Sequence, residues 1–370
     1  MTLACALKGN QKVFYIQRGV AASCCRAYPV PLPADLSCLL NVWDLESQQL
    51  SQGVPVAGCK SCWQQEQQGM LSFRQLYSDK NRTKDVIELY LSNLCNHMCS
   101  YCSPKFSSIW EDSISTRGMF ENISASAKDN LKIIDHAQVD PEHWFQEIGQ
   151  YIVSRPKNSV NLKLLGGEPL MQFKNLQKVI ELGSDNINQL IIQTNLNPPN
   201  NKFLIWLLEN VPIEKLKFII SIDSTPEYNH IPRSGFDREQ FLINLELLKQ
   251  HQVQFTLLSV FSVLSIFDLA NFVHWAKPYT LDFSRLYGAD CLQPNLLPPS
   301  IIEQICQNFN GHPWPKLLQE LYENRKEPLD LKLFEQYNYL KEYFNRTKIV
   351  PENIDNTVFQ QYWTLISKKF

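Results

Sequence analysis

The sequence lacks a strong excess of either charge, because 35 Lys and Arg residues stand against 37 Asp and Glu residues among 370. A formal net charge of −2 gives neither the basic face of a nucleic-acid-binding protein nor a polybasic membrane anchor. Long apolar runs are also missing: no window approaches the roughly 18 apolar residues of a membrane span, and the initial MTLACALKGNQ has no signal-peptide pattern. We therefore expect a soluble cytoplasmic protein without membrane or nucleic-acid partners.

Cysteine is the residue that the chain has in abundance. Eleven cysteines are many for a cytoplasmic protein, in which disulfides are rare and clustered cysteines favour metal binding or catalysis. Two groups stand out: Cys5, Cys24, Cys25, Cys59 and Cys62 in the first part of the chain, and then Cys95, Cys99 and Cys102. The isolated Cys38, Cys291 and Cys306 are expected to be ordinary buried or half-buried thiols.

Six strand-forming apolar segments alternate with amphipathic, helix-length segments after residue 83. The strand candidates are KDVIELYLSN (84–93), SVNLKLLGG (159–167), NQLIIQTN (188–195), LKFIISID (216–223), VQFTLLSV (253–260) and YTLDFSRL (279–286). The alternation predicts an α/β fold of parallel strands joined by right-handed crossovers. Six units are too few for a complete eight-unit barrel, so an open six-strand barrel or a doubly wound sheet fits the pattern.

The rest of the chain departs from this alternation. Residues 1–83 have no long apolar periodicity, so we expect an irregular unit held by something other than an apolar core. Residues 106–139 are long for a connection and are expected to form an excursion over the sheet. From residue 291 a proline-punctuated loop leads into amphipathic segments. We predict a cysteine-rich domain at 1–83, an α/β core at 84–290 and a C-terminal helical extension at 291–370.

Cys95, Cys99 and Cys102 lie in the stretch LCNHMCSYCSP, directly after the first predicted strand. In parallel α/β folds the chemistry is placed at the carboxyl ends of the strands. A loop can bend three thiolates towards one point, as an iron–sulfur cluster requires, whereas structural zinc takes four ligands, usually as two separated pairs. Three thiolates on a four-iron cluster leave one iron open. His97, inside the triple, is expected to be a spacer.

The spacing C-x3-C-x2-C, with Tyr101 before the last cysteine, resembles the signature of the radical S-adenosylmethionine (SAM) superfamily. LLGGEP (164–169), QTNL (193–196), ISIDS (220–224) and the NHIPRSG segment resemble the same family in order, over residues 84–290. The resemblance implies a partial (β/α)6 barrel and a [4Fe–4S] cluster on the three catalytic cysteines, Cys95, Cys99 and Cys102. It also implies SAM contacts from Tyr101, Gly166, Gly167, Glu168, Asn195, Ser221, Asp223 and Arg233.

The N-terminal cysteines include a C-x2-C pair, Cys59 and Cys62. Together with Cys5 and one of the vicinal Cys24 and Cys25 they could form a four-ligand site, but spacing leaves zinc, an iron–sulfur cluster and plain thiols open. The tail that follows, marked by Glu66, Gly69, Ser72 and Arg74, resembles the twitch-domain-containing radical SAM proteins. That resemblance implies an auxiliary [4Fe–4S] cluster on Cys5, Cys24, Cys59 and Cys62, with Cys25 as the alternative to Cys24.

The resemblance implies an enzyme that cleaves SAM reductively to a 5′-deoxyadenosyl radical, which abstracts hydrogen from a substrate. We expect a peptide or small natural-product intermediate that is oxidised, epimerised or cross-linked, and an external electron donor such as flavodoxin or ferredoxin. The alternative is a non-catalytic iron–sulfur protein with a structural or redox-sensing role. Tyr287 is expected at the reaction rim, as a packing or substrate-contacting residue, and Trp110 and Trp144 are expected to be core or lid residues.

Overall fold

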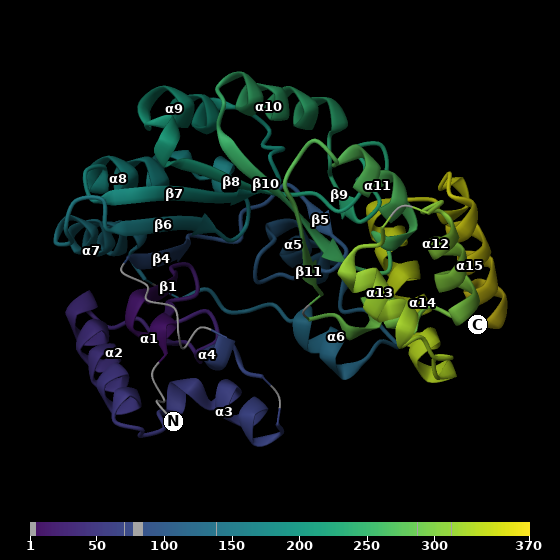
Figure 1. Ribbon diagram of the computed structural model, residues 1–370, viewed down its shortest axis with the longest axis horizontal. Helices are drawn as coiled ribbons and strands as arrows, with labels where there is room; N and C mark the ends of the chain where they lie inside the picture. Colours follow the sequence, from purple (N-terminus) through teal and green to yellow (C-terminus); the bar gives the residue numbers. More distant parts are fainter. Residues whose placement is uncertain (1–4, 70, 77–83, 138, 287, 312) are drawn as a thin grey trace. The chain divides into compact units, whose positions relative to one another are not determined.

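The computed structural model describes residues 5–69, 71–76, 84–137, 139–286, 288–311 and 313–370 (Figure 1). Tyr287 lies outside these residues. All six strand candidates form strands: β4 (Asp85–Tyr90), β6 (Val160–Leu165), β7 (Ile187–Thr194), β8 (Leu216–Ser221), β10 (Gln254–Phe261) and β11 (Leu281–Arg285). Among the described residues, one nine-stranded sheet has the order β11-β10-β8-β7-β6-β4-β1-β2-β3. The pairs β4–β6, β6–β7 and β10–β11 are parallel, as predicted.

Residue contacts divide the chain into two compact units. The first comprises Met1–Asn93, Asp135–Gln193 and Asn200–Phe218, and the second Leu94–Ile134, Thr194–Pro199 and Ile219–Phe370. This division follows spatial packing, so each unit draws on several separate stretches of the chain. The three-domain division at residues 83 and 290 remains a prediction from the sequence.

The N-terminal part of the first unit is more regular than expected. It contains β1 (Gln11–Tyr15), β2 (Val20–Ala22), β3 (Val30–Pro31), α1 (Ala6–Asn10), α2 (Leu36–Ser51), a 3-10 turn at Ala57–Cys59, α3 (Lys60–Gln67) and α4 (Phe73–Leu76). β1 pairs parallel with β4, and β2 pairs antiparallel with β1. The prediction of an irregular segment without an apolar core is therefore wrong, because β1 extends the sheet and buries Val13 and Phe14 completely.

Three helices of the first unit lie along one side of β4, β6 and β7 in Figure 1: α7 (Pro141–Val153), α8 (Phe173–Gly183) and α9 (Lys202–Asn210). α7 begins as predicted, with the Asp140 side chain accepting a hydrogen bond from the Glu142 amide and Pro141 at the first helical position. α7 and α8 pack closely, because a Cβ at Gly183 would lie only 2.6 Å from Cγ2 of Ile152. A 3-10 turn at Ile213–Lys215 precedes β8.

The second unit begins with the cysteine loop. This loop contains β5 (Met98–Cys99), which pairs antiparallel with β9 (Arg233–Ser234). The expected excursion forms α5 (Ser108–Arg117) and α6 (Ala125–Asn130). α10 (Arg238–Gln250) precedes β10, and a 3-10 turn at Ile266–Asp268 with α11 (Leu269–Trp275) leads to β11.

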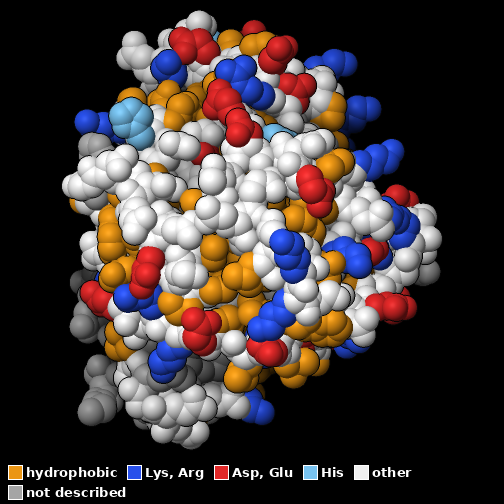
Figure 2. Space-filling view, turned by 90° about the vertical axis from the view of Figure 1, so that its right-hand side faces the viewer, with side chains coloured by type: hydrophobic (Ala, Val, Ile, Leu, Met, Phe, Trp, Pro, Cys, Tyr) orange, Lys and Arg blue, Asp and Glu red, His pale blue; other side chains and the backbone are white. Residues whose placement is uncertain are grey.

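The C-terminal residues of the second unit are helical, as predicted. Turns at Asp290–Leu292 and Pro294–Leu296 lead to α12 (Pro299–Gln307), α13 (Lys316–Glu323), α14 (Asp330–Thr347), a turn at Pro351–Asn353 and α15 (Thr357–Lys369). Their core is aromatic, since Tyr339, Tyr343, Phe359 and Tyr362 are completely buried. Figure 2 shows acidic and basic side chains interspersed on the surface turned towards the viewer. Within the described residues, no helix has both the length and the apolar character needed to cross a bilayer.

Candidate iron–sulfur and cofactor site

The β5–β9 pair holds the loop that carries Cys95, Cys99 and Cys102. It places Cys99 opposite Arg233, and Cys99 is buried whereas Cys95 and Cys102 are half-buried. Burial raises the pKa of Cys99 well above its usual value, the Arg233 charge opposes this shift, and the other two cysteines add to it. Cys95, Cys99 and Cys102 thus lie in one loop, whose middle the β5–β9 pair fixes opposite Arg233.

Aromatic side chains from distant positions hold the backbone of this loop. The indole Nε1 of Trp110 donates to the carbonyl of Cys99 at 2.8 Å. Two tyrosines of α14 donate to neighbouring carbonyls, Tyr339 to Ser100 at 2.7 Å and Tyr343 to Met98 at 3.1 Å. All three aromatic residues are completely buried. The sequence predicts Trp110 as a core or lid residue. It does not mark the two tyrosines as site residues, because tyrosines at helical spacing are typical of an ordinary helix core.

Asparagines that follow β7 fix the residues between the first two cysteines. Asn195 donates its side-chain Nδ2 to Oδ1 of Asn96 at 3.0 Å. The amide of Asn197 has a definite orientation, since its Nδ2 donates to the carbonyl of Asp237 and its Oδ1 accepts from the Asp237 amide, each at 2.7 Å. Asn195 of QTNL and Asn197, just after it, therefore support the cysteine loop through Asn96 and His97.

The orientation of Asn197 settles the tautomer of His97. Nε2 of His97 lies 3.1 Å from Oδ1 of Asn197, and this oxygen can only accept, so Nε2 carries the proton. Nδ1 is then a bare acceptor, and it is buried without a partner among the described residues. Burial lowers the pKa of His97 to about 3, with the Arg233 charge acting in the same direction. His97 is thus a neutral, buried side chain inside the triple.

Tyr101, Asp223 and Arg233 form a buried hydrogen-bonded network. The Tyr101 hydroxyl donates to Oδ2 of Asp223 at 2.6 Å, and Nη1 of Arg233 lies 2.6 Å from the hydroxyl and 3.2 Å from Oδ2. The other oxygen of Asp223 accepts from the Val260 amide at 2.8 Å. Nε of Arg233 is buried and has no partner among the residues that the structure describes. The structure therefore joins three of the expected SAM-contacting residues, and half-buried Ser221 ends β8 nearby in the sequence.

The GGEP segment lies in the first unit, at the end of β6. Gly166 and Gly167 have φ angles of +76° and +48°, a conformation that favours glycine. A side chain at Gly166 would also collide with Tyr90, whose Cδ1 would lie 2.7 Å from the added Cβ. Glu168 is buried, and its Oε1 accepts from the Leu170 amide at 3.0 Å at the start of the 3-10 turn Pro169–Met171. The glycines thus leave backbone accessible beside an oriented carboxylate.

The N-terminal cysteines form a second group within the first unit. Burial raises the pKa of Cys24 to about 12, and Cys25, Cys5 and Cys59 raise it further. Burial raises the pKa of Cys59 to about 11, with contributions from Cys5 and Cys62. Of Cys5, Cys24, Cys59 and Cys62, Cys5 and Cys59 pack in one small apolar cluster.

Cys25 has a different set of neighbours. Burial raises its pKa, and the other main influences are Glu88, Arg26 and Lys163 rather than Cys5 or Cys59. Its amide donates to Oε1 of Gln11 at 3.3 Å. Of the vicinal pair, Cys24 is buried and Cys25 is exposed, a distinction that spacing does not give.

The polar tail after Cys62 folds back on itself. Nε of Arg74 donates to Oε1 of Glu66 at 3.1 Å, Nη2 of Arg74 donates to Oε2 at 2.5 Å, and the Ser72 hydroxyl also bonds to Glu66. The Arg74 guanidinium lies 4.4 Å from the ring centre of Trp63, next to Cys62 in the chain. Gly69, with a φ of +71°, makes the turn. These residues brace α3, which carries Cys62.

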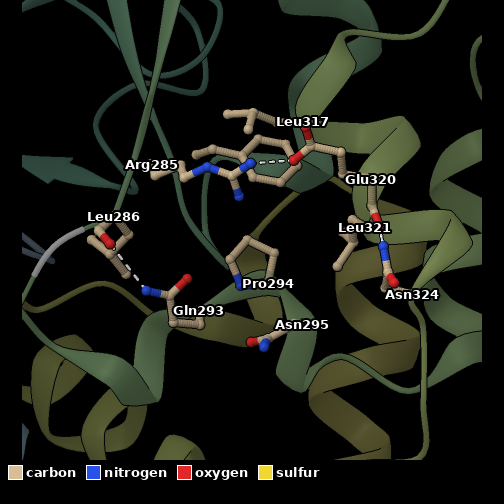
Figure 3. A pocket seen from close by; sticks show the side chains of 10 residues that line it. Arg285, Leu286, Gln293, Pro294, Asn295, Leu317, Glu320, Leu321 and Asn324 are labelled. Atoms are coloured by element: carbon tan, nitrogen blue, oxygen red, sulfur yellow. Dashed lines mark hydrogen bonds and ion pairs between the residues drawn. The ribbon is translucent and has the colours of Figure 1, made fainter. Parts of the chain in front are cut away.

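A pocket of about 320 Å³ opens in the second unit, where β10 and β11 end (Figure 3). Its lining consists of Phe261, Arg285, Leu286, Gln293, Pro294, Asn295, Leu317, Glu320, Leu321 and Asn324. Arg285 is ion-paired with Glu320 of α13 across the pocket, and Gln293 donates Nε2 to the carbonyl of Leu286 at 3.0 Å. The pocket therefore combines apolar walls with hydrogen-bond donors and hydrogen-bond acceptors.

Three further cysteines lie outside both groups. Cys291 and Cys306 are buried, as predicted, but Cys38 is exposed. The expectation that Cys38 is at least half-buried is wrong, because it lies on the solvent side of the first turn of α2. Trp144, like Trp110, is a core residue. In the part of the chain that the structure describes, no three His, Cys, Asp or Glu side chains are arranged to hold a single metal ion.

No protein-family model and no curated protein matches the chain. Among solved structures, the chain is similar to anSMEcpe with bound AdoMet, with a TM-score of 0.42 and 17% identity over 66% of this chain and 61% of that one. A second similar structure is anSMEcpe with bound AdoMet and the Cp18Cys peptide (TM-score 0.39, 17% identity, 60% and 58% covered). A third is SuiB from Streptococcus suis (TM-score 0.40, 11% identity, 96% and 77% covered).

The chain thus spans 61% of the length of the first of these structures. Similarity at TM-scores below 0.5 carries no functional argument.

Proposed function

We propose that this protein is a radical SAM enzyme with its catalytic [4Fe–4S] cluster on Cys95, Cys99 and Cys102. The observation that carries the proposal is the pairing of β5 with β9, which sets Cys99, in one loop with Cys95 and Cys102, opposite the buried Arg233. Nearby cationic groups favour the thiolate form that binds iron. The fourth iron then has no cysteine from this loop and is free to bind SAM.

The buried polar groups around the loop fit an anionic, acceptor-rich cluster. Ser100 Oγ and Arg233 Nε are donors, and both are buried without an acceptor among the described residues. An unsatisfied buried donor costs about 1–3 kcal/mol. Hydrogen bonds to the sulfur atoms of a cluster are a normal part of such sites. A bound cluster with its cofactor would give these donors the acceptors that the described part of the chain does not provide.

Each of the predicted cofactor residues then has a proposed task. The backbone at Gly166 and Gly167, with Glu168, would bind the amino group of SAM. Asn195 orients the cysteine loop through Asn96. Tyr101 and Asp223 already bond to each other, so we propose that they fix Arg233, whose free Nε–H would bind the SAM carboxylate. Ser221 would contact the ribose.

The bound cluster, once reduced, would supply the electron that cleaves SAM to a 5′-deoxyadenosyl radical, which abstracts hydrogen from the substrate. The protein's own residues bind and orient the cofactor and exclude water. An external donor such as flavodoxin or ferredoxin would deliver the electron. Cytoplasmic location fits this dependence on a reducing environment.

We further propose an auxiliary [4Fe–4S] cluster on Cys5, Cys24, Cys59 and Cys62, in the manner of the twitch-domain proteins. Its support is that Cys24, Cys59 and Cys62 are buried and Cys5 is half-buried. Cys59 lies in a small apolar cluster with Leu50 and Val56, against which Cys5 and Trp63 pack. With four cysteine ligands this cluster would be closed and would serve in electron transfer.

The substrate that we propose is a peptide or a small natural-product intermediate, which is oxidised, epimerised or cross-linked. The pocket at the ends of β10 and β11 has the position expected of a substrate site in a parallel α/β fold. Its volume of about 320 Å³ lies within the usual range of ligand pockets. Acceptors such as Oε1 of Gln293 and donors such as Arg285 suit a substrate with amide groups, because an amide offers one donor and one acceptor.

The decisive experiment is anaerobic reconstitution with iron and sulfide, followed by dithionite and SAM. We expect 5′-deoxyadenosine, and we expect it to disappear when Cys95, Cys99 and Cys102 are replaced by alanine. The matched control is Cys38→Ala, since Cys38 is exposed and outside both groups. Loaded clusters without 5′-deoxyadenosine would favour the alternative, a non-catalytic iron–sulfur protein with a structural or redox-sensing role.

Iron counting separates the two cluster proposals. About eight irons per chain would support two four-iron clusters, and about four would contradict the auxiliary cluster. Deuterium transfer from a labelled substrate into 5′-deoxyadenosine would then locate the abstracted hydrogen.

A further inference from the structure

A buried ion pair lies beside the N-terminal cysteines. Nζ of Lys8 pairs with the carboxylate of Glu46 and also bonds to the Ser23 hydroxyl. Only 1% of the Lys8 side chain is exposed, against 23% of the Glu46 side chain. The three partners come from α1, α2 and the residues after β2. Lys8 is thus a cation held inside the protein by two fixed contacts.

The contacts of this pair reach several of the cysteine segments. The Lys8 amide donates to the carbonyl of Cys5 at 3.1 Å, and Ser23 directly precedes Cys24. On the Cys59 side, a Cβ added at Gly58 would lie 3.1 Å from Nζ of Lys8 and 3.5 Å from Oε1 of Glu46. The absence of a side chain at Gly58 therefore leaves the space that brings the ion pair against the Cys59 segment.

Stability alone is a poor reason for such an arrangement. Burying two charges carries a desolvation cost that their attraction offsets only in part, and an apolar replacement is often equally stable. A four-thiolate iron–sulfur cluster, however, carries a net negative charge, and its reduction potential depends on nearby charges and on hydrogen bonds. A buried cation next to the ligands stabilises the more negative, reduced cluster, and a buried anion opposes it.

We propose that Lys8 and Glu46 form a charge pair that sets the reduction potential of the auxiliary cluster. This inference rests on the proposed auxiliary cluster and adds the residues that tune it. Lys8 raises the potential, and Glu46 limits the increase by holding and partly neutralising the lysine. Both are positioning residues, since neither is a ligand.

The test is a reductive titration of the full-length, reconstituted protein, followed by electron paramagnetic resonance. The Cys95, Cys99 and Cys102 alanine variant identifies which signal belongs to the N-terminal cluster. We expect Lys8→Met to shift the midpoint potential of that signal downwards and Glu46→Gln to shift it upwards. The double variant should lie between the two. A merely structural ion pair would give no such opposite signs.

Lys12→Met is the matched control. Lys12 is another buried lysine of the first unit, and its acidic partner is Asp85 at 3.5 Å. It is not among the groups named as shifting the pKa of Cys24 or Cys59. Its potential should equal that of the wild type. Shifts of the same sign, or no shifts in variants that retain about eight irons, would overturn the inference while leaving the auxiliary cluster intact.

If Lys8→Met does not bind iron in the N-terminal site, the test rests on Glu46→Gln, whose side chain is more exposed. A midpoint potential that does not rise in Glu46→Gln would then reject the proposal. About four irons in the wild type would instead remove the auxiliary cluster itself, and the inference with it.

Discussion

Replacing Tyr343 by phenylalanine tests how the C-terminal helices support the cysteine loop. The Tyr343 hydroxyl lies 3.1 Å from the carbonyl of Met98 and 3.0 Å from that of Ile231, and it accepts from the Ser234 amide at 3.3 Å. It therefore joins both strands of the β5–β9 pair. The side chain is completely buried, so no water replaces the lost hydroxyl.

The cost follows from these contacts. One hydroxyl proton serves one of the two carbonyls at a time, so the substitution removes about two hydrogen bonds, each with a net value of about 1–1.5 kcal/mol. We expect the free energy of unfolding of the second unit to fall by about 2–3 kcal/mol. Because the same bonds fix the backbone beside Cys99, we also expect less iron on the catalytic cysteines.

The assay is urea unfolding followed by circular dichroism, with iron content measured on the same preparations. Tyr337→Phe is the matched control, since Tyr337 lies on the same helix, is half-buried and makes ring contacts with Trp363 and Phe370. It should change stability by less than about 0.5 kcal/mol. If the two variants unfold alike and bind equal iron, the hydroxyl does not hold the loop and the reasoning is refuted.

Four further outcomes are expected. Cys24→Ala should lower the iron content from about eight to about four per chain, whereas Cys25→Ala should leave it unchanged; the reverse result would make Cys25 the ligand. Arg233→Met should destabilise the second unit by about 3–5 kcal/mol because it leaves Asp223 buried without its cation, and Tyr101→Phe should cost less, both measured by urea unfolding. Burial raises the pKa of Asp268, so the native protein takes up a proton at higher pH than the unfolded chain does. The free energy of unfolding of the wild type, relative to that of Asp268→Asn, should therefore increase as the pH falls from 7 towards 4.5. A decrease would contradict the burial effect. Chelation of iron should make the N-terminal cysteine segment sensitive to protease before the cysteine loop of the second unit, as measured by mass spectrometry of the fragments. Simultaneous cleavage would contradict the idea that the metal stabilises the first segment and hydrogen bonds stabilise the second.

The strands of the parallel sheet were predictable because each is a short apolar run between helices with clear signals, such as the Asp140–Pro141 start of α7. The N-terminal segment was misjudged for a physical reason. Its strand β1 has only five residues and four of them are buried, so it shows no alternation. The helix α2 did carry a signal, since Leu36, Leu39, Trp43 and Leu50 have helical spacing and are buried. Proline and polar residues around it obscured that pattern.

The candidate site was predictable as far as spacing within one loop allows. The gaps between Cys95, Cys99 and Cys102 are a property of the sequence, and the structure fixes the middle of their loop by pairing β5 with β9. The supports of the loop were not predictable, since Tyr339 and Tyr343 bond to residues 239 and 245 positions away. Spacing also gave no basis for choosing between Cys24 and Cys25, because the choice depends on which thiol faces Cys5 and Cys59.

The two cysteine groups differ in how much of their geometry exists without a metal. The triple Cys95, Cys99 and Cys102 lies in one loop, whose backbone is fixed by Trp110, Tyr339 and Tyr343. The N-terminal group draws its thiols from separate segments, and only Cys5 and Cys59 among them belong to the small apolar cluster with Leu50 and Val56. When ligands come from separate segments, the free energy of metal binding is also free energy of folding. An auxiliary cluster would therefore stabilise the N-terminal segment directly, whereas the catalytic loop would keep its shape when the cluster is lost and could be rebuilt in place.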